Sequence, residues 1–116
     1  MSIWQEMLPH NTCLIGVEGR LDQSQNPLLE ESLLRLLAEG HHRLLVDLSQ
    51  ATYINSGGLR CLVSAWRKAR QQEGNLILFG LNTRLQEIFS MVGFDKVFQI
   101  VSTRSDAFHV LEENDS

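Results

Sequence analysis

Residues 53–59 read Tyr-Ile-Asn-Ser-Gly-Gly-Leu, and this stretch joins a predicted strand to a predicted helix. The segment before it, residues 43–48 (Arg-Leu-Leu-Val-Asp-Leu), is an almost continuous apolar run, which is typical of a strand buried on both faces. The segment after it, residues 57–72, has apolar residues at helical spacing, which predicts an amphipathic helix. A buried strand that leads through a tight turn into a helix is typical of an α/β fold.

Ser56 lies at this turn, where the helix is expected to begin. A serine in that place usually caps the helix, because its oxygen accepts a hydrogen bond from a free backbone N–H of the first turn. The place also suits an anion, since the free N–H groups and the helix dipole favour negative charge. A phosphate on Ser56 would be tolerated by the fold while changing the surface that a partner meets. Two interpretations therefore stand on physical grounds: a plain helix cap, which is the commoner role, and a regulatory phosphoserine.

Strand and helix patterns continue on both sides of this stretch. Residues 9–11 (Pro-His-Asn) indicate a turn between two extended segments, which predicts an opening hairpin. Asn26 and Pro27 predict the start of a helix, with Asn26 as its cap. Gly40 is placed to end that helix.

The rest of the chain repeats the strand–helix pattern. Strands are predicted over residues 76–80 and 96–101, each followed by an amphipathic helix, and residues 112–116 are expected to form a frayed polar tail. This alternation predicts an α/β fold: a mixed, mostly parallel sheet with an N-terminal hairpin and about four helices packed on it. Residues 1–116 form a single predicted domain, with a core at about residues 10–111.

The composition argues against several classes of function. The chain has 116 residues and a net charge of −4, so no basic patch for nucleic acid is expected. Its apolar runs fall far short of the roughly 20 residues that span a bilayer, and its N-terminus lacks a signal-peptide pattern. A cytoplasmic protein without a membrane segment is therefore expected. Cys13 and Cys61 are interpreted as buried thiols, and the spacing of cysteines and histidines predicts no metal site.

Catalytic constellations are not visible in the sequence either. There are no paired carboxylates at helical spacing and no phosphate-binding glycine loop, so no cofactor is expected. Ser56 does not lie in a Gly-x-Ser-x-Gly elbow. No histidine stands at a motif-defined position to activate its hydroxyl. The chain is therefore expected not to be an enzyme.

Four short motifs follow one another along the chain: Gly19-Arg20-Leu21-Asp22; Val46-Asp47-Leu48-Ser49 with the stretch 53–59; Gly74-Asn75-Leu76; and Met91-Val92-Gly93-Phe94-Asp95-Lys96-Val97-Phe98. Each motif is weak alone, but their order and spacing are specific. Together they resemble the STAS domain, the fold of the bacterial anti-sigma factor antagonists. The similarity covers about residues 10–111 and implies the STAS fold.

The resemblance also implies a function. Ser56 stands where the family carries a serine that is phosphorylated by an anti-sigma factor with serine kinase activity. Unphosphorylated family members bind that anti-sigma factor and release its sigma factor, and a PP2C-type phosphatase reverses the modification. By the same resemblance the partner-binding surface comprises Asp22, Asn55, Ser56, Gly57, Gly58 and Arg60.

Three residues depart from the family's pattern. Asn55 replaces an acidic residue, which keeps the turn-forming chemistry but removes one negative charge beside a future phosphate. Gly57 replaces a serine or threonine, so that Ser56 is the single hydroxyl candidate in the turn. Arg60 stands where a small residue is expected, and it could select a partner or compensate a phosphate. On physical grounds Gly57 and Gly58 are also interpreted as a sterically relaxed turn.

Other functions stay open at this point. Asp22 is equally well explained as a carboxylate that ends a loop or caps a helix. The domain could be an unswitched scaffold of a stress-signalling complex, or the cytoplasmic subunit of a lipid-transport ATPase. A monomer or a weak dimer is expected.

Overall fold

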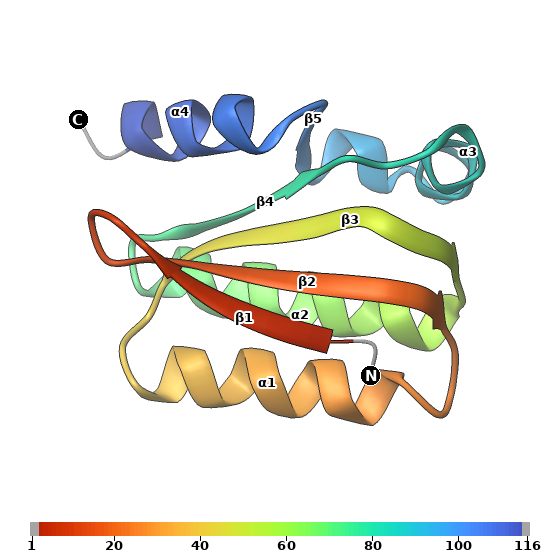
Figure 1. The fold of residues 1–116 in the computed structure, drawn as a ribbon, viewed down its shortest axis with the longest axis horizontal. Coiled ribbons are helices and arrows are strands. Elements are labelled where there is room, and N and C mark those ends of the chain that lie inside the picture. Colours follow the sequence, from red (N-terminus) through yellow and green to blue (C-terminus); the bar gives the residue numbers. More distant parts are fainter. Residues whose placement is uncertain (1–2, 115–116) are drawn as a thin grey trace.

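The computed structural model describes residues 3–114 and contains the predicted order of strands and helices (Figure 1). A short 3₁₀ turn, Phe94–Lys96, precedes the last strand. The other elements are β1 (Ile3–Leu8), β2 (Thr12–Leu21), α1 (Asn26–Ala38), β3 (Arg43–Ile54), α2 (Ser56–Gln71), β4 (Asn75–Phe79), α3 (Thr83–Met91), β5 (Gln99–Val101) and α4 (Arg104–Asn114).

The five strands form one sheet in the order β1-β2-β3-β4-β5. β1 and β2 are antiparallel and form the predicted hairpin. The pairs β2–β3, β3–β4 and β4–β5 are parallel, because a helix or a longer connection returns the chain to the same end of the sheet each time. The predicted α/β fold with a mixed, mostly parallel sheet is thus confirmed.

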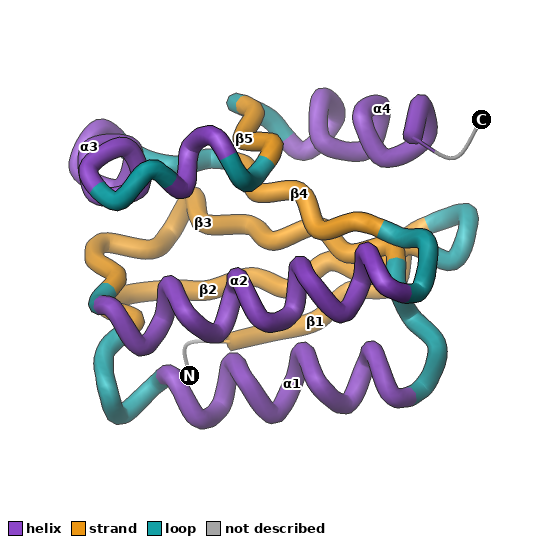
Figure 2. Tube along the Cα trace, turned by 180° about the vertical axis from the view of Figure 1, so that it is seen from behind, coloured by secondary structure: helices purple, strands orange, loops and turns teal. Residues whose placement is uncertain are grey.

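Helices cover both faces of the sheet. α1 and α2 lie side by side on one face (Figure 2), where they and α3 bury the larger apolar core. α4 lies on the opposite face (Figure 1), over a smaller apolar cluster that includes Leu45, Ile77 and Leu111. Both clusters draw on the same strands, because successive side chains of a strand point to opposite faces. Leu44 faces the larger core and its neighbour Leu45 the smaller one.

Three boundaries differ from the sequence-based predictions by three residues or more. β3 continues six residues beyond Leu48 to Ile54, because its polar second half still pairs with β2 and buries Ala51 and Ile54. β5 begins only at Gln99, since the residues before it form the 3₁₀ turn. α4 continues to Asn114, so the prediction of a frayed tail is wrong for residues 112–114; residues 115 and 116 lie outside the described part.

The end of α4 is held by a buried guanidinium. Arg43, at the start of β3, donates from Nε to the carbonyl oxygen of His10 (2.9 Å) and from Nη2 to Oε1 of Glu112 (3.1 Å). The ring nitrogen Nδ1 of His10 also lies 2.6 Å from that oxygen of Glu112. The hydrogen bond from His10 lowers the pKa of Glu112, and the charges of His10, Arg43 and His109 act in the same direction. The hairpin turn, β3 and α4 are therefore joined at one point.

Candidate functional site

The turn that carries Ser56 lies at the carboxyl end of β3, beside the carboxyl end of β2. The backbone N–H of Asn55 donates to the carbonyl oxygen of Leu21 (3.0 Å), and Asp22 follows directly. Parallel strands end at the same edge of a sheet, which is where ligands and partners commonly bind in α/β folds. The structure therefore brings the motif Gly19-Arg20-Leu21-Asp22 and the Ser56 turn together.

Asn55, and not Ser56, caps helix α2. The side-chain oxygen of Asn55 accepts a hydrogen bond from the backbone N–H of Gly58 (3.0 Å), and its backbone is extended (φ −99°, ψ −179°). Ser56 is the first residue of the helix and is exposed. Its hydroxyl makes no hydrogen bond with any of the residues 3–114. The interpretation of Ser56 as a cap is wrong, because the amide of the preceding residue already occupies that role.

Asn26 supports this cap instead of capping its own helix. It is the first residue of α1, where Gln25 is the cap position. Its side-chain nitrogen Nδ2 donates to Oδ1 of Asn55 (2.8 Å), the same oxygen that accepts from Gly58. The predicted role of Asn26 as a cap is therefore wrong. Its hydrogen bond instead joins the beginnings of α1 and α2 and fixes the orientation of the Asn55 side chain.

Gly57 and Gly58 are required by close packing and not by a relaxed turn. Both lie inside α2, and neither has a positive φ. A Cβ atom on Gly57 would lie 2.6 Å from Nδ2 of Asn26, and one on Gly58 would lie 2.7 Å from Cγ1 of Ile54. A side chain at Gly57 would displace the Asn26 amide from the cap, and one at Gly58 would force the Ile54 side chain to move. The interpretation of a sterically relaxed turn is therefore wrong, because a Cβ atom at either position would lie within 3 Å of a neighbouring side chain.

Asp22 is engaged locally. Its Oδ1 accepts hydrogen bonds from the backbone N–H (3.0 Å) and the hydroxyl (2.7 Å) of Ser24. The hydroxyl bond in the first place, and the backbone bond after it, lower the pKa of Asp22. Its carbonyl oxygen accepts the N–H groups of Gln25 and Asn26 at the start of α1. Asp22 therefore stabilises the loop between β2 and α1. Its ionised carboxylate lies at the same edge of the sheet as Ser56.

Ser56 lies between two surface depressions. The first, here called the α1–α2 groove, is lined by residues that include Asn26, Glu30, Ser56, Arg60 and Arg67. The second, here called the α2–α3 groove, runs from Ser56 to the C-terminal end of α3. Arg60 and Arg67 are exposed and form no ion pair with the described carboxylates. Arg60 is therefore a cation, unpaired within residues 3–114, one helical turn from Ser56 in a chain whose net charge is −4.

A second cationic group, which has no signal in the sequence, lies near this turn. The guanidinium of Arg20 lies 4.4 Å, and that of Arg84 5.9 Å, from the ring centroid of Tyr53. Arg20 and Tyr53 are partners in the β2–β3 register, while Arg84 comes from α3. No local signal could have found this group, because it depends on a strand register and on the placing of a helix.

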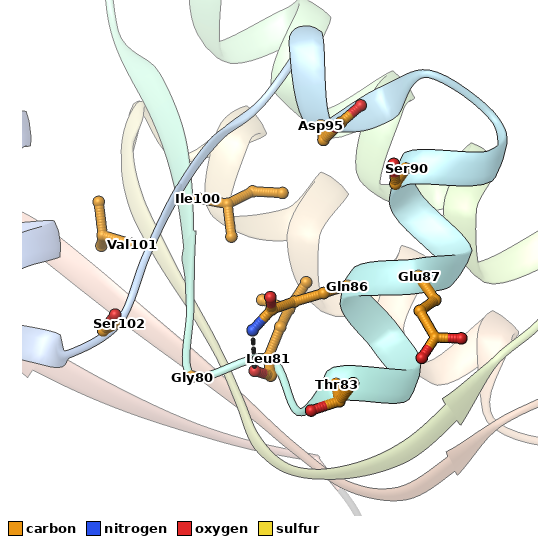
Figure 3. A pocket seen from close by; sticks show the side chains of 10 residues that line it. All are labelled: Gly80, Leu81, Thr83, Gln86, Glu87, Ser90, Asp95, Ile100, Val101 and Ser102. Atoms are coloured by element: carbon orange, nitrogen blue, oxygen red, sulfur yellow. Dashed lines mark hydrogen bonds between the residues drawn. The ribbon is translucent and has the colours of Figure 1, made fainter.

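The remaining candidate features do not add to the site. Cys13 and Cys61 are buried thiols, as predicted, and burial raises the pKa of both. Within residues 3–114 no cluster of three or more His, Cys, Asp or Glu side chains is arranged for a metal ion. A further depression lies between β5 and α3 (Figure 3), where Gln86 donates to the carbonyl of Leu81 (2.9 Å). Its carboxylates, Glu87 and Asp95, do not converge.

A sequence model of the STAS domain matches residues 7–107. The chain belongs to the STAS domain family. BtrV of Bordetella bronchiseptica is 33% identical to this STAS domain, over 82% of this chain and 79% of its own. The anti-sigma-B factor antagonist of Listeria monocytogenes is 30% identical, over 79% of this chain and 81% of its own.

Solved structures have the same fold. The phosphorylated form of the Bacillus protein SpoIIAA superposes with a TM-score of 0.76, at 16% identity, over 93% of this chain and 97% of that one. The unphosphorylated form gives the same TM-score at 15% identity, over 96% and 98%. At these identities the likeness establishes the STAS fold alone. Within residues 3–114 of this STAS domain no helix has the length and apolar character to cross a membrane.

Proposed function

We propose that this STAS domain is an anti-sigma factor antagonist that binds its anti-sigma factor through the Ser56 turn, and that phosphorylation of Ser56 ends the binding. The names of its curated relatives support the first part. The second part is carried by one observation: the Ser56 hydroxyl is exposed and free of hydrogen bonds to the described residues, because Asn55 caps the helix. A kinase can reach such a hydroxyl without disturbing the fold.

The proposed switch is electrostatic and local. A phosphate adds about two negative charges at the first residue of α2. The free N–H groups of the first helical turn and the cationic side chain of Arg60 favour those charges within the domain. A partner surface that fits the neutral serine would instead meet a bulky anion. Binding would therefore be lost while the domain keeps its fold.

The proposed partner-binding residues divide by exposure. Ser56 and Arg60 are exposed, and Asp22 and Gly57 are half-buried, so these four are assigned direct contact with the partner. Asn55 and Gly58 are assigned a supporting role, since the first holds the cap and the second is buried against Ile54. The proposed partners are an anti-sigma factor with serine kinase activity and a PP2C-type phosphatase.

Intact-mass analysis after incubation with ATP and the kinase encoded beside the gene tests this function. Wild type should gain one phosphate, and Ser56→Ala should gain none. Ser64→Ala is the matched control, because Ser64 is another exposed serine of α2 and its loss should leave the phosphate in place.

Two other outcomes would change the proposed function. Binding without phosphate transfer would contradict the switch and favour an unswitched scaffold. The differences from the family's usual residues at Asn55 and Gly57 would then explain that result. Neither binding nor transfer would contradict the assignment of the partner.

A further inference from the structure

Apolar side chains are exposed at the end of α3, on the far side of the α2–α3 groove from Ser56. Met91 is 84% exposed and its neighbour Val92 50% exposed. Single exposed apolar residues are common on protein surfaces, but neighbouring ones that line a depression are typical of binding sites. These two belong to the same depression as Ser56.

The groove is built from three elements. The end of β3 contributes Tyr53 and Ile54, the start of α2 contributes Ser56 and Leu59, and α3 contributes Ile88 beside Met91 and Val92. Ile54 and Leu59 are buried and Ile88 is half-buried, so the floor of the groove is aliphatic and continuous with the larger core. A partner that contacts Ser56 from this side also covers the apolar end of α3.

Three arginines and two carboxylates lie in or beside the groove. Arg84 lines it, and Arg20 stacks on Tyr53 at its border. Neither guanidinium forms an ion pair with a carboxylate of residues 3–114. Arg60 is exposed on the other side of Ser56. Against these three cations, the carboxylates nearby are Glu87, which lines the groove, and Asp22, which follows β2.

We propose that the anti-sigma factor inserts an apolar side chain, flanked by carboxylates, into the α2–α3 groove. The inference rests on the proposed function and adds to it the chemistry of the partner's contact surface. Apolar burial at Met91 and Val92 supplies affinity, while the arginines attract and orient the acidic flanks. A phosphate on Ser56 would lie in the wall of the same groove. It would repel the carboxylates of the partner and compete with them for the arginines. The direction of the proposed switch follows from this geometry.

Isosteric polar substitutions test the apolar part. The double variant Met91→Gln/Val92→Thr keeps the size of both side chains while removing their apolar character. Its affinity for the anti-sigma factor encoded beside the gene, measured by isothermal titration, should fall about tenfold or more. The matched control is Met7→Gln/Val97→Thr, because these side chains are 58% and 39% exposed and neither lines the groove. The control should bind as wild type does.

A charge variant tests the acidic part independently. Arg84→Gln should weaken binding and reduce its dependence on salt, because one screened attraction has been removed. Thermal unfolding of each variant, compared with wild type, checks that a loss of binding is not a loss of the fold.

The outcomes separate the two proposals. If wild type binds and is phosphorylated at Ser56 but Met91→Gln/Val92→Thr binds equally well, the groove is not the contact surface and the proposed function stands. If wild type neither binds nor is phosphorylated, both proposals are wrong.

Discussion

At the scale of the residue, one cap decides what Ser56 is available to do. Asn55 and Ser56 are both good helix caps, and they are neighbours in the sequence. The side chain of Asn55 takes the role because it also accepts a hydrogen bond from Asn26. An amide oxygen with two acceptor sites satisfies both donors. The serine is thereby shifted to the first helical position with its hydroxyl directed to solvent.

We expect Asn55→Ala to destabilise the domain by about 1–2 kcal/mol, because it removes the cap and leaves the amide of Asn26 without its acceptor. Ser56→Ala should change the free energy of unfolding by no more than about 0.5 kcal/mol, as is usual for exposed positions. Urea unfolding of the two variants measures the difference. Equal destabilisation by both variants would mean that Ser56 contributes to the cap in solution.

At the scale of the element, ionic contacts hold both ends of α4 in addition to its apolar face, with Arg104 at its start paired to Glu6 of β1. Its buried side chains are small in number, with Ala107 and Leu111 facing the sheet. Near its end, the carboxylate of Glu112 is hydrogen-bonded to the side chains of Arg43, from β3, and His10, from the hairpin turn. Half-buried Phe108 and Val110 also pack against the same cluster.

The contacts of Glu112 predict a dependence of stability on pH. The hydrogen bond from His10 holds the pKa of Glu112 below its ordinary value of 4.5, so the ionised carboxylate is favoured in the folded state. Its contribution is present above that value and is lost as the pH falls through the lower folded pKa. Glu112→Gln should therefore be less stable than wild type above pH 4.5, with a difference that shrinks below it.

Urea midpoints measured across this pH range provide the comparison. Asp22, whose pKa is also lowered, contributes the same acid sensitivity to both proteins and cancels from the difference. A gap between wild type and Glu112→Gln that stays constant with pH would contradict the role of the ionised carboxylate.

At the scale of the whole molecule, the proposed site lies at one end of the sheet, at the border of the larger core. The Ser56 turn lies at the carboxyl end of the parallel strands, with α1 and α2 beginning beside it (Figures 1 and 2). The turn is attached to the core through Ile54 and Leu59, which are buried, while Ser56 is exposed. A charge added there changes the surface and not the packing.

Phosphorylation of Ser56 should therefore leave the far-UV circular dichroism unchanged and raise the free energy of unfolding by roughly 0.3–1 kcal/mol, the usual gain from an anion at a helix N-terminus. Urea unfolding of the two forms at low salt measures the gain, and added salt should reduce it by screening. A phosphorylated form that is less stable, or that loses helical signal, would show that the modification acts by unfolding the turn.

The order of the elements, the hairpin and the helix after Ser56 follow from the sequence alone, because apolar periodicity and turn residues are local signals. The family is also indicated by short motifs in a fixed order. The family in turn indicates which serine is the candidate site. The extension of β3 to Ile54 does not follow from the sequence, because pairing with β2 stabilises a segment whose own pattern is polar.

The contacts that shape the candidate site come from the folded arrangement of the chain. Asn26 lies 29 residues from Asn55 in the sequence, yet their hydrogen bond selects the cap. The glycines are needed because Asn26 and Ile54 approach the helix closely, and the cationic border forms because Arg84 is brought to Tyr53. These contacts join residues far apart along the chain, so their energies depend on the folded arrangement and leave no trace in local periodicity.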